Sequence, residues 1–366
     1  MSPFAPYTLA GRTLRNRFVV APMTTSQSHV DGAPSEAEAR WLGRLCDDGY
    51  GLVITCAAAV SKTSIAFHRQ LSFGEDALVP ALTALAARLR RPNQALIAQL
   101  CHGGSRTIPS LTGLPAASAS RYELPIEGFV PPLELTTRQI EGIIDDFASA
   151  AVRAARAGFD GVELHGANGY LQTQFTSTMT NRRTDAWGGS LENRARFSRE
   201  CVRAIRARVP SDFLVGYRVS LEGFGLETGL DLDENVRLLQ WLAEDGISWA
   251  HLSHFEAAAR ARKYPERFLV SYVREGVGAE LPLISAGSVR SRADAERALE
   301  LGADLVAVAR AAIGNDQVPA RLERDEALVW TPFARQRLRA LAVSEAFIDY
   351  MTNTSPVNSL NIVAGE

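Results

Sequence analysis

The residues best suited to chemistry are polar side chains that follow short apolar segments. Each of them alone has a structural explanation, since a threonine at a strand end is often a cap and an arginine is often half of an ion pair. Together they offer hydrogen-bond donors and acceptors but neither a carboxylate pair nor a cysteine with a base, which suits the binding of a polar aromatic ring. The set comprises Thr24, Gln99, His102, His165, Asn168, Arg218, Ser288 and Arg310.

A second combination, small residues beside one arginine, is typical of phosphate binding. Gly287 and Ser288 end one apolar segment, and Ala309 and Arg310 end the next. Small residues allow backbone N–H groups to approach a phosphate closely, and a guanidinium can bind two of its oxygens. We therefore expect these residues to form a phosphate site.

The elements that must position these residues alternate along the chain. Eight short apolar segments are each followed by a segment with helical spacing. Such alternation predicts a parallel sheet, and eight units fit a closed barrel better than an open doubly wound sheet. The predicted fold class is α/β, a (β/α)8 TIM barrel whose carboxyl strand ends would bring the polar residues to one rim. The expected strands span residues 17–23, 51–58, 94–101, 161–165, 213–220, 249–254, 281–287 and 304–310.

Two of the intervening helices have readable starts. Ser35 with Glu38, and Thr136 with Gln139, have the spacing of a capping box, in which each side chain bonds the other residue's backbone N–H. We expect a helix to begin after Ser35 and another after Thr136.

Two stretches do not fit the repeating unit. Residues 108–132 are rich in proline, and residues 175–190 are polar and end in glycines. Long loops at the carboxyl face of a barrel usually shape the active-site mouth. We predict a single barrel domain over residues 1–325 with such loops, followed by a C-terminal extension over residues 326–366 that packs on the barrel or on a neighbouring subunit.

The composition restricts the partners. The chain has 366 residues, of which 46% are hydrophobic, and a formal net charge of −2, with its basic residues scattered. Neither nucleic acid nor an anionic membrane surface is expected to bind it, and no apolar run is long enough to span a bilayer. We expect a cytoplasmic protein that binds a small molecule, with a homo-oligomer left open.

No metal site is expected. His251 and His254 have no carboxylate at a suitable spacing, so we interpret them as ordinary strand-end histidines. The cysteines lie far apart without Cys-x-x-Cys spacing and are interpreted as buried thiols. They are Cys46, Cys56, Cys101 and Cys201.

Several segments resemble one known family. The sequence VELHGANGYL at 162–171, followed by NRRTDAWGGSLENR at 181–194, closely resembles the signature of the old yellow enzyme family, the NADH:flavin oxidoreductases. Segments 16–24 and 99–104 and the last two predicted strand ends look like the family's as well, in the same order. The resemblance covers residues from about 5 to 325 and implies an FMN-binding TIM barrel.

For the cofactor, the resemblance implies an FMN site with a defined role for each part of the rim. Thr24 would bond near the C4 carbonyl and N5 of the flavin, Gln99 would hold the pyrimidine edge, and Arg218 would sit by N1 and the C2 carbonyl. The last strand ends would bind the FMN phosphate. The implied cofactor residues are Pro22, Met23, Thr24, Ala57, Gln99, His165, Arg218, Gly287, Ser288, Ala309 and Arg310.

For the reaction, the resemblance implies reduction of FMN by NADH or NADPH and then of an activated alkene. His165 and Asn168 would donate to the oxygen of an enone or nitroalkene, so that the β-carbon accepts hydride from flavin N5. Tyr170 would give a proton to the α-carbon as a general acid. These three are the candidate catalytic residues of an ene-reductase.

Alternatives and departures remain. Another FMN-dependent barrel oxidoreductase, acting on a hydroxy acid or a dihydropyrimidine, or a non-catalytic flavin-binding redox sensor, would also use the ring and phosphate residues. One subgroup of the family has a cysteine and a tyrosine after the first strand, where this chain has Thr24, Thr25 and Ser26. The glycine usual before the phosphate arginine is Ala309, and the arginine usual after the Gly-Gly turn comes one place late, as Arg106.

Overall fold

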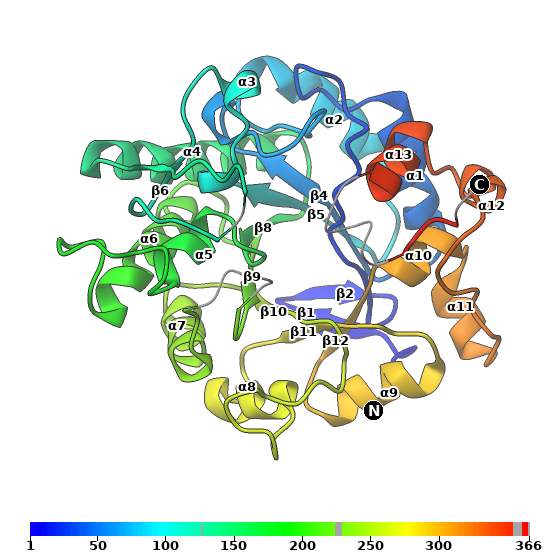
Figure 1. Ribbon diagram of the computed structural model, residues 1–366. Coiled ribbons are helices and arrows are strands. Elements are labelled where there is room, and N and C mark those ends of the chain that lie inside the picture. Colours follow the sequence, from blue (N-terminus) through cyan, green and yellow to red (C-terminus); the bar gives the residue numbers. More distant parts are fainter. Residues whose placement is uncertain (126, 224–228, 354–360, 365–366) are drawn as a thin grey trace.

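Eight parallel strands close a barrel, which Figure 1 shows with helices around it. The computed structural model describes residues 1–125, 127–223, 229–353 and 361–364. To within one residue, each strand falls inside a segment predicted from the sequence, so the predicted (β/α)8 barrel is confirmed. Around the barrel the strands are β3 (Phe18–Val20), β4 (Leu52–Ala59), β5 (Ala95–Cys101), β8 (Gly161–Gly166), β9 (Leu214–Ser220), β10 (Trp249–Ser253), β11 (Leu283–Ala286) and β12 (Leu305–Val308), and β12 pairs back to β3.

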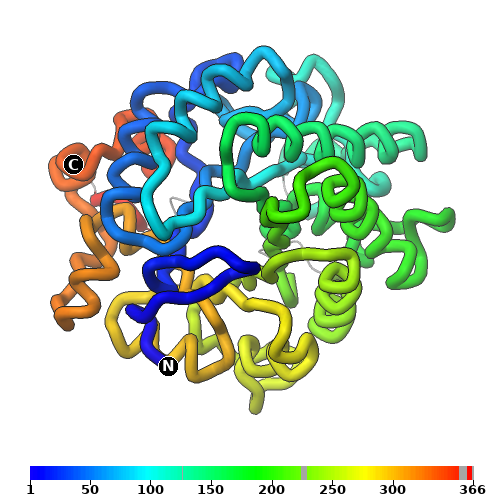
Figure 2. The backbone as a smooth tube through the Cα atoms, turned by 180° about the vertical axis from the view of Figure 1, so that it is seen from behind, coloured from blue at the N-terminus to red at the C-terminus, as the bar shows by residue number. Residues whose placement is uncertain are grey.

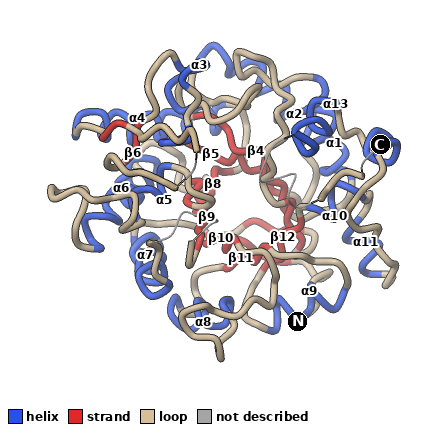
Figure 3. The backbone as a smooth tube through the Cα atoms, in the orientation of Figure 1, coloured by secondary structure: helices blue, strands red, loops and turns tan. Residues whose placement is uncertain are grey.

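Helices cover the outside of the barrel, as Figure 3 shows in blue around the red strands. Those between the strands are α1 (Glu36–Asp47), α2 (Val79–Leu89), α4 (Thr137–Arg156), α6 (Leu191–Arg206), α7 (Leu232–Glu244), α8 (Leu269–Val277) and α9 (Arg292–Glu300). After β12 follow α10 (Arg310–Gly314), α11 (Val318–Glu323), α12 (Arg335–Ala340) and α13 (Glu345–Asn353).

Short elements fill the two long loops and the start of the chain. The loop after β5 contains α3 (Pro109–Thr112) and a small sheet of β6 (Ala117–Ser118) and β7 (Leu133–Glu134), and the loop after β8 contains α5 (Leu171–Thr176). Single 3-10 turns are η1 (Lys62–Ser64), η2 (Asp76–Leu78) and η3 (Gly104–Arg106). An antiparallel hairpin of β1 (Tyr7–Leu9) and β2 (Arg12–Leu14) precedes the barrel.

The helix starts show how far capping can be read from sequence. The capping box of Thr136 and Gln139 is complete, and α4 begins there as predicted. At α1 the box is only half formed, because Ser35 accepts from the Glu38 N–H but the Glu38 side chain turns inward. Glu38 is buried with its carboxyl group at the Ser28 hydroxyl and 3.2 Å from the Cys56 thiol, and this burial raises its pKa. Contacts with the buried Ser28 and Cys56 side chains therefore take the place of the predicted bond from the Ser35 N–H to the Glu38 side chain.

The barrel interior has two chemically different sides, each defined by five side chains. Residues of β11, β12, β3 and β4 form an apolar wall, which packs in one buried cluster with Leu9 and Leu14 of the hairpin and with apolar residues at the starts of β5, β9 and β10. The hairpin lies across the end of the barrel opposite the carboxyl strand ends, in dark blue in Figure 2. The apolar wall comprises Val19, Leu52, Ile54, Ile284 and Leu305, and the polar wall, on β5, β8, β9 and β10, comprises Gln99, Glu163, His165, Arg218 and His251.

One glycine makes room inside the barrel. Gly216 of β9 pairs with Glu163 on one side and Trp249 on the other. A Cβ atom at Gly216 would lie 2.0 Å from the Trp249 ring, so only glycine fits there. The Trp249 indole can therefore enter the interior, where its N–H donates to Glu163 at 3.0 Å.

The second signature segment shapes the loop after β8. The Asn181 amide donates to the backbone oxygens of Phe175 and Trp187 at 2.7 and 2.8 Å. Arg183 is buried, and its guanidinium donates to two backbone oxygens of the loop that follows β5. Polar side chains of segment 181–194 thus satisfy buried backbone groups and join the two long loops, which is a structural role.

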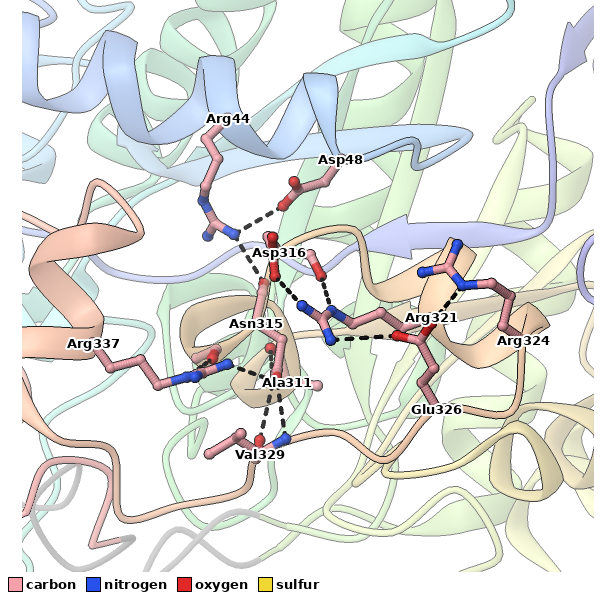
Figure 4. Close-up of polar contacts among 11 residues, drawn as sticks. Arg44, Asp48, Ala311, Asn315, Asp316, Arg321, Arg324, Glu326, Val329 and Arg337 are labelled. Carbon is pink, nitrogen blue, oxygen red and sulfur yellow. Dashed lines mark hydrogen bonds and ion pairs between the residues drawn. The ribbon is translucent and has the colours of Figure 1, made fainter.

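The chain after β12 is bound to the barrel through a buried asparagine, shown in Figure 4. The Asn315 amide donates to the Val329 oxygen and accepts from the Val329 N–H, both at 2.9 Å. Arg44 of α1 donates to the Asn315 backbone oxygen at 2.9 Å, and Arg337 of α12 donates to the Gly314 oxygen at 2.5 Å. These bonds connect α1, α10 and α12.

The last helix packs beside α1. The Phe347 ring meets the Trp41 ring edge-on, with centroids 5.4 Å apart, and the Ser344 hydroxyl donates to Gln27 at 2.6 Å. Residues 354–360 and 365–366 of the predicted C-terminal extension lie outside the described residues.

Three further expectations concern membranes, thiols and metals. Within the described ranges, no helix combines the length and apolar character needed to cross a bilayer. The four cysteines are free and buried, as interpreted. In the same part of the chain, the structure places no three His, Cys, Asp or Glu side chains where they could share a metal ion.

Candidate active site

A cavity of ≈ 500 Å³ lies at the carboxyl ends of the barrel strands. This volume falls in the range of small-molecule and cofactor sites. Its lining includes every residue to which the sequence assigned a cofactor or catalytic role, so positions distant in the chain come together as expected. They are Pro22, Met23, Thr24, Ala57, Gln99, His165, Asn168, Tyr170, Arg218, Gly287, Ser288, Ala309 and Arg310.

His165, at the end of β8, is a neutral donor. Its Nδ1 accepts the Ala167 N–H at 3.4 Å, so the ring proton is on Nε2. Burial, and then the nearby Arg218 cation, holds the pKa of His165 well below its ordinary value. The ring therefore stays uncharged near neutral pH and offers an Nε2–H.

Asn168 is held beside it by an unusual backbone. Its φ is 57°, in the left-handed region where asparagine is among the few tolerated side chains, and its N–H donates to the Ser220 hydroxyl at 2.9 Å. The side-chain oxygen accepts from the Ser253 hydroxyl at 3.4 Å. Because the oxygen is engaged, the amide NH2 is the group left for a ligand.

Tyr170 stands at the start of α5, next to both donors. Its ring centroid lies 4.7 Å from that of His165, and the Arg106 guanidinium lies 5.6 Å from the ring centroid on its face. The phenol group thus shares the cavity with the two N–H donors and a cation. Sequence reasoning placed Arg106 only as a displaced family arginine.

Gln99 and Arg218 occupy the polar wall below the rim. The Gln99 amide donates to Glu163 at 2.8 Å. Burial lowers the pKa of Arg218, which still remains a cation at neutral pH, and its Nε–H has no hydrogen-bond partner among the described residues. A buried cation with a donor to spare suits a ligand edge with carbonyl oxygens or developing negative charge.

The opposite end of the cavity has the features of an anion site. The Arg310 guanidinium donates to the Ser288 hydroxyl, and Arg310 is also the first residue of α10, where backbone N–H groups lack partners within the helix. Arg310 and Arg290 lie on the Trp330 ring, 5.2 and 4.9 Å from its centroid. Arg310 therefore gives this end of the cavity a cation, whereas Arg290 lies outside the cavity lining and pairs with Glu256 at 3.5 Å.

The structure changes the explanation for two of the predicted phosphate residues. The N–H and hydroxyl of Ser288 both donate to the Phe255 oxygen, at 2.9 and 2.8 Å, so Ser288 chiefly orients Arg310. A Cβ atom at Gly287 would lie 2.2 Å from the Ala257 nitrogen. The glycine is therefore required by the packing of the loop after β10, whatever it binds.

The interpretation of the strand-end histidines needs a correction. His251 lies within β10, fully buried, and its Nδ1 is 2.9 Å from the Glu163 carboxylate. This carboxylate was not recognised because it is 88 residues away along the chain. His254 does lie after the strand end, with its ring nitrogens at the Glu256 oxygen and the Ser285 hydroxyl.

Among the residues of the cavity region that the sequence did not indicate, two bear directly on the site. Tyr350 of α13 lines the cavity and contacts the Thr24 side chain. Nothing in the sequence indicates this, because α13 reaches the rim only through tertiary packing. Glu163 had a signal, since it is a lone acid in the apolar strand β8.

Comparisons with known proteins identify the family. Residues 2–328 match the model of the NADH:flavin oxidoreductase / NADH oxidase family, so the chain belongs to that family, the one whose signature its sequence resembles. The probable NADH-dependent flavin oxidoreductase YqiG of Bacillus subtilis is 36% identical over 326 residues, which are 84% of either chain. The NADH:fumarate oxidoreductase of Klebsiella pneumoniae is 33% identical over 88% of this chain, which spans 36% of that longer protein.

Solved structures give the same fold. The old yellow enzyme homologue from Zymomonas mobilis has a TM-score of 0.81 at 24% identity, covering 96% of this chain and 99% of that one. Morphinone reductase in complex with tetrahydroNAD has a TM-score of 0.79 at 28% identity, covering 96% and 97%.

The protein is accordingly an NADH- or NADPH-dependent flavin oxidoreductase, and its cofactor is FMN. The cavity suits that cofactor. It offers the Arg218 Nε–H, which has no partner among the described residues, the Arg310 cation, and small or apolar residues such as Ala57.

Proposed function

We propose that the protein reduces the carbon–carbon double bond of alkenes activated by a carbonyl or nitro group, with His165, Asn168 and Tyr170 as catalytic residues. The observation that carries this is the pair of neutral N–H donors three residues apart, each fixed by a hydrogen bond to its other polar atom. A phenol group lies beside them. Two oriented donors and one acid are what polarised-alkene reduction requires.

We also propose how the remaining residues hold FMN. Arg218 and Gln99 bind the pyrimidine edge, and Arg310 with the first amides of α10 binds the phosphate. Pro22, Met23, Thr24 and Ala57 line the ring, with His165 also in contact, and Gly287, Ser288 and Ala309 shape the phosphate end.

In this proposal each catalytic residue has one task. When bound and reduced by NADH or NADPH, FMN supplies a hydride for the β-carbon. His165 Nε2–H and Asn168 Nδ2–H donate to the substrate oxygen, where negative charge develops, and each such donor is commonly worth about 3 to 4 kcal/mol in the transition state. Tyr170 delivers its hydroxyl proton to the α-carbon.

The test is the double variant His165→Ala with Asn168→Ala. We expect the purified variant to keep its yellow FMN colour, to bind a phenol more weakly, and to reduce 2-cyclohexenone at least about 10²-fold more slowly with NADH or NADPH, because the oxyanion loses its donors. His29→Ala is the control, since His29 is exposed and outside the cavity lining. Turnover equal to that of the control would refute the proposal.

A further inference from the structure

A carboxylate is buried in the barrel among the residues proposed to hold FMN. Glu163 of β8 has no exposed surface, and three side chains donate to it. Its Oε1 accepts from Gln99 at 2.8 Å, and its Oε2 accepts from the Trp249 indole at 3.0 Å and from His251 Nδ1 at 2.9 Å. One carboxylate therefore joins β5 to β10 across the polar wall.

The charge states of this cluster follow from its contacts. Burial raises the pKa of Glu163, but the hydrogen bonds from His251 and the Trp249 indole, together with the Arg218 cation, bring it below its ordinary value, so the group is an anion. Burial lowers the pKa of His251, whose ring is neutral and donates its Nδ1–H. An anion at this depth costs more to bury than an apolar side chain of similar volume. Packing alone does not account for it.

We propose that Glu163 is a positioning residue that fixes the Gln99 amide and lowers the reduction potential of bound FMN. The inference rests on the proposed roles of Gln99 and Arg218. The carboxylate accepts a hydrogen bond from Gln99 Nε2. If the Gln99 amide were rotated by 180°, its carbonyl oxygen would face the Glu163 carboxylate oxygen, so that orientation is excluded. Gln99 is left with its carbonyl oxygen and second N–H as a fixed acceptor and donor pair for the cavity.

The effect on potential follows from charge. Glu163 pairs with Gly216, two residues before Arg218, and its anion interacts with the Arg218 cation. A flavin gains negative charge on reduction, which a fixed cation favours and a fixed anion opposes. Glu163 thus offsets part of the effect of Arg218, and the reduced cofactor becomes a stronger hydride donor.

The test is Glu163→Gln, which removes the charge and keeps the shape. In FMN-loaded protein, we expect the midpoint potential from dye equilibration to move in the positive direction. A tenfold change in the equilibrium between oxidised and reduced flavin corresponds to about 30 mV for a two-electron couple, and a shift of that order is expected.

Trp249→Phe is the matched control, because it deletes one hydrogen bond to the same carboxylate and keeps the charge. Its loss of stability should resemble that of Glu163→Gln, whereas its potential should stay near that of the native protein. Equal shifts in the two variants would mean that packing sets the potential, and would overturn the proposal.

Glu163→Asp provides a second test that does not depend on how Glu163→Gln folds. The shorter side chain keeps the charge but withdraws from Gln99, so FMN should bind more weakly while the potential remains native-like. A raised potential in Glu163→Asp, or an unchanged one in FMN-loaded Glu163→Gln, overturns this inference alone. If the native protein binds FMN but reduces no activated alkene, the proposed function is refuted instead, whatever the effect of Glu163 on the potential.

Discussion

The polar wall and the apolar wall enclose the same barrel but contribute differently to it. On the apolar wall, Val19, Ile54 and Leu305 pack with the hairpin and make no polar contact through their side chains. On the polar wall, Gln99 and His251 are both bonded to the buried Glu163. The comparison suggests that stability and chemistry are divided between the two sides, and this division can be tested by changing one wall at a time.

The largest expected effect is on the polar side, at the loop that follows β8. Tyr170→Phe removes the proposed proton donor, so alkene reduction should slow by about 10² to 10⁴-fold. Flavin reduction by NADH or NADPH needs no such proton and should keep its rate. Stopped-flow measurement of the two half-reactions checks this, and equal slowing of both would argue against the assignment.

On the apolar side, Leu305→Ala should act on stability alone. The substitution opens a cavity in a fully buried position, which typically costs about 2 to 5 kcal/mol in the free energy of unfolding. Denaturant titration of FMN-loaded protein measures that loss. The midpoint potential should not change, and a shift like that expected for Glu163→Gln would break the proposed division between the walls.

The smallest effect is a pH dependence at His102, which directly follows the polar-wall strand β5. The His102 Nδ1 accepts the Gly104 N–H at 3.0 Å, and burial lowers the pKa of His102 to about 3. Between about pH 6.5 and pH 3 the unfolded chain binds a proton that native His102 does not, so the free energy of unfolding should fall as pH falls.

The slope from one such histidine approaches about 1.4 kcal/mol per pH unit, and it vanishes above about pH 7.5. Comparing unfolding curves of the native protein and His102→Gln at several pH values isolates this contribution. An unchanged slope in the variant would show that His102 titrates normally when folded.

The sequence predicted the fold well because the barrel strands are short apolar runs, with polar residues only where they end. Thr24, Gln99 and Arg218 could be placed at one rim for that reason alone. Glu163 was not recognised as an organiser of the site, because its partners Gln99 and His251 lie 64 and 88 residues away. Such pairings depend on strand register, which one sequence does not reveal.

Contacts that depend on tertiary packing could not be predicted from the sequence either. Tyr350 reaches the cavity only because Phe347 and Ser344 hold α13 against the barrel. Glu38 has the right spacing for a capping box, yet buried partners in the fold compete successfully for its carboxyl group. Local pattern therefore located the elements, while the choice among possible partners required the assembled molecule.

The hairpin of β1 and β2 has a kinetic consequence. Leu9 and Leu14 pack with the apolar side chains of the barrel interior and close its far end, so a molecule bound at the carboxyl rim must leave by the side from which it came. A nicotinamide and an alkene that both need the same flavin face would then take turns, each departing before the other arrives. Such alternation gives parallel lines in double-reciprocal plots, the mark of ping-pong turnover.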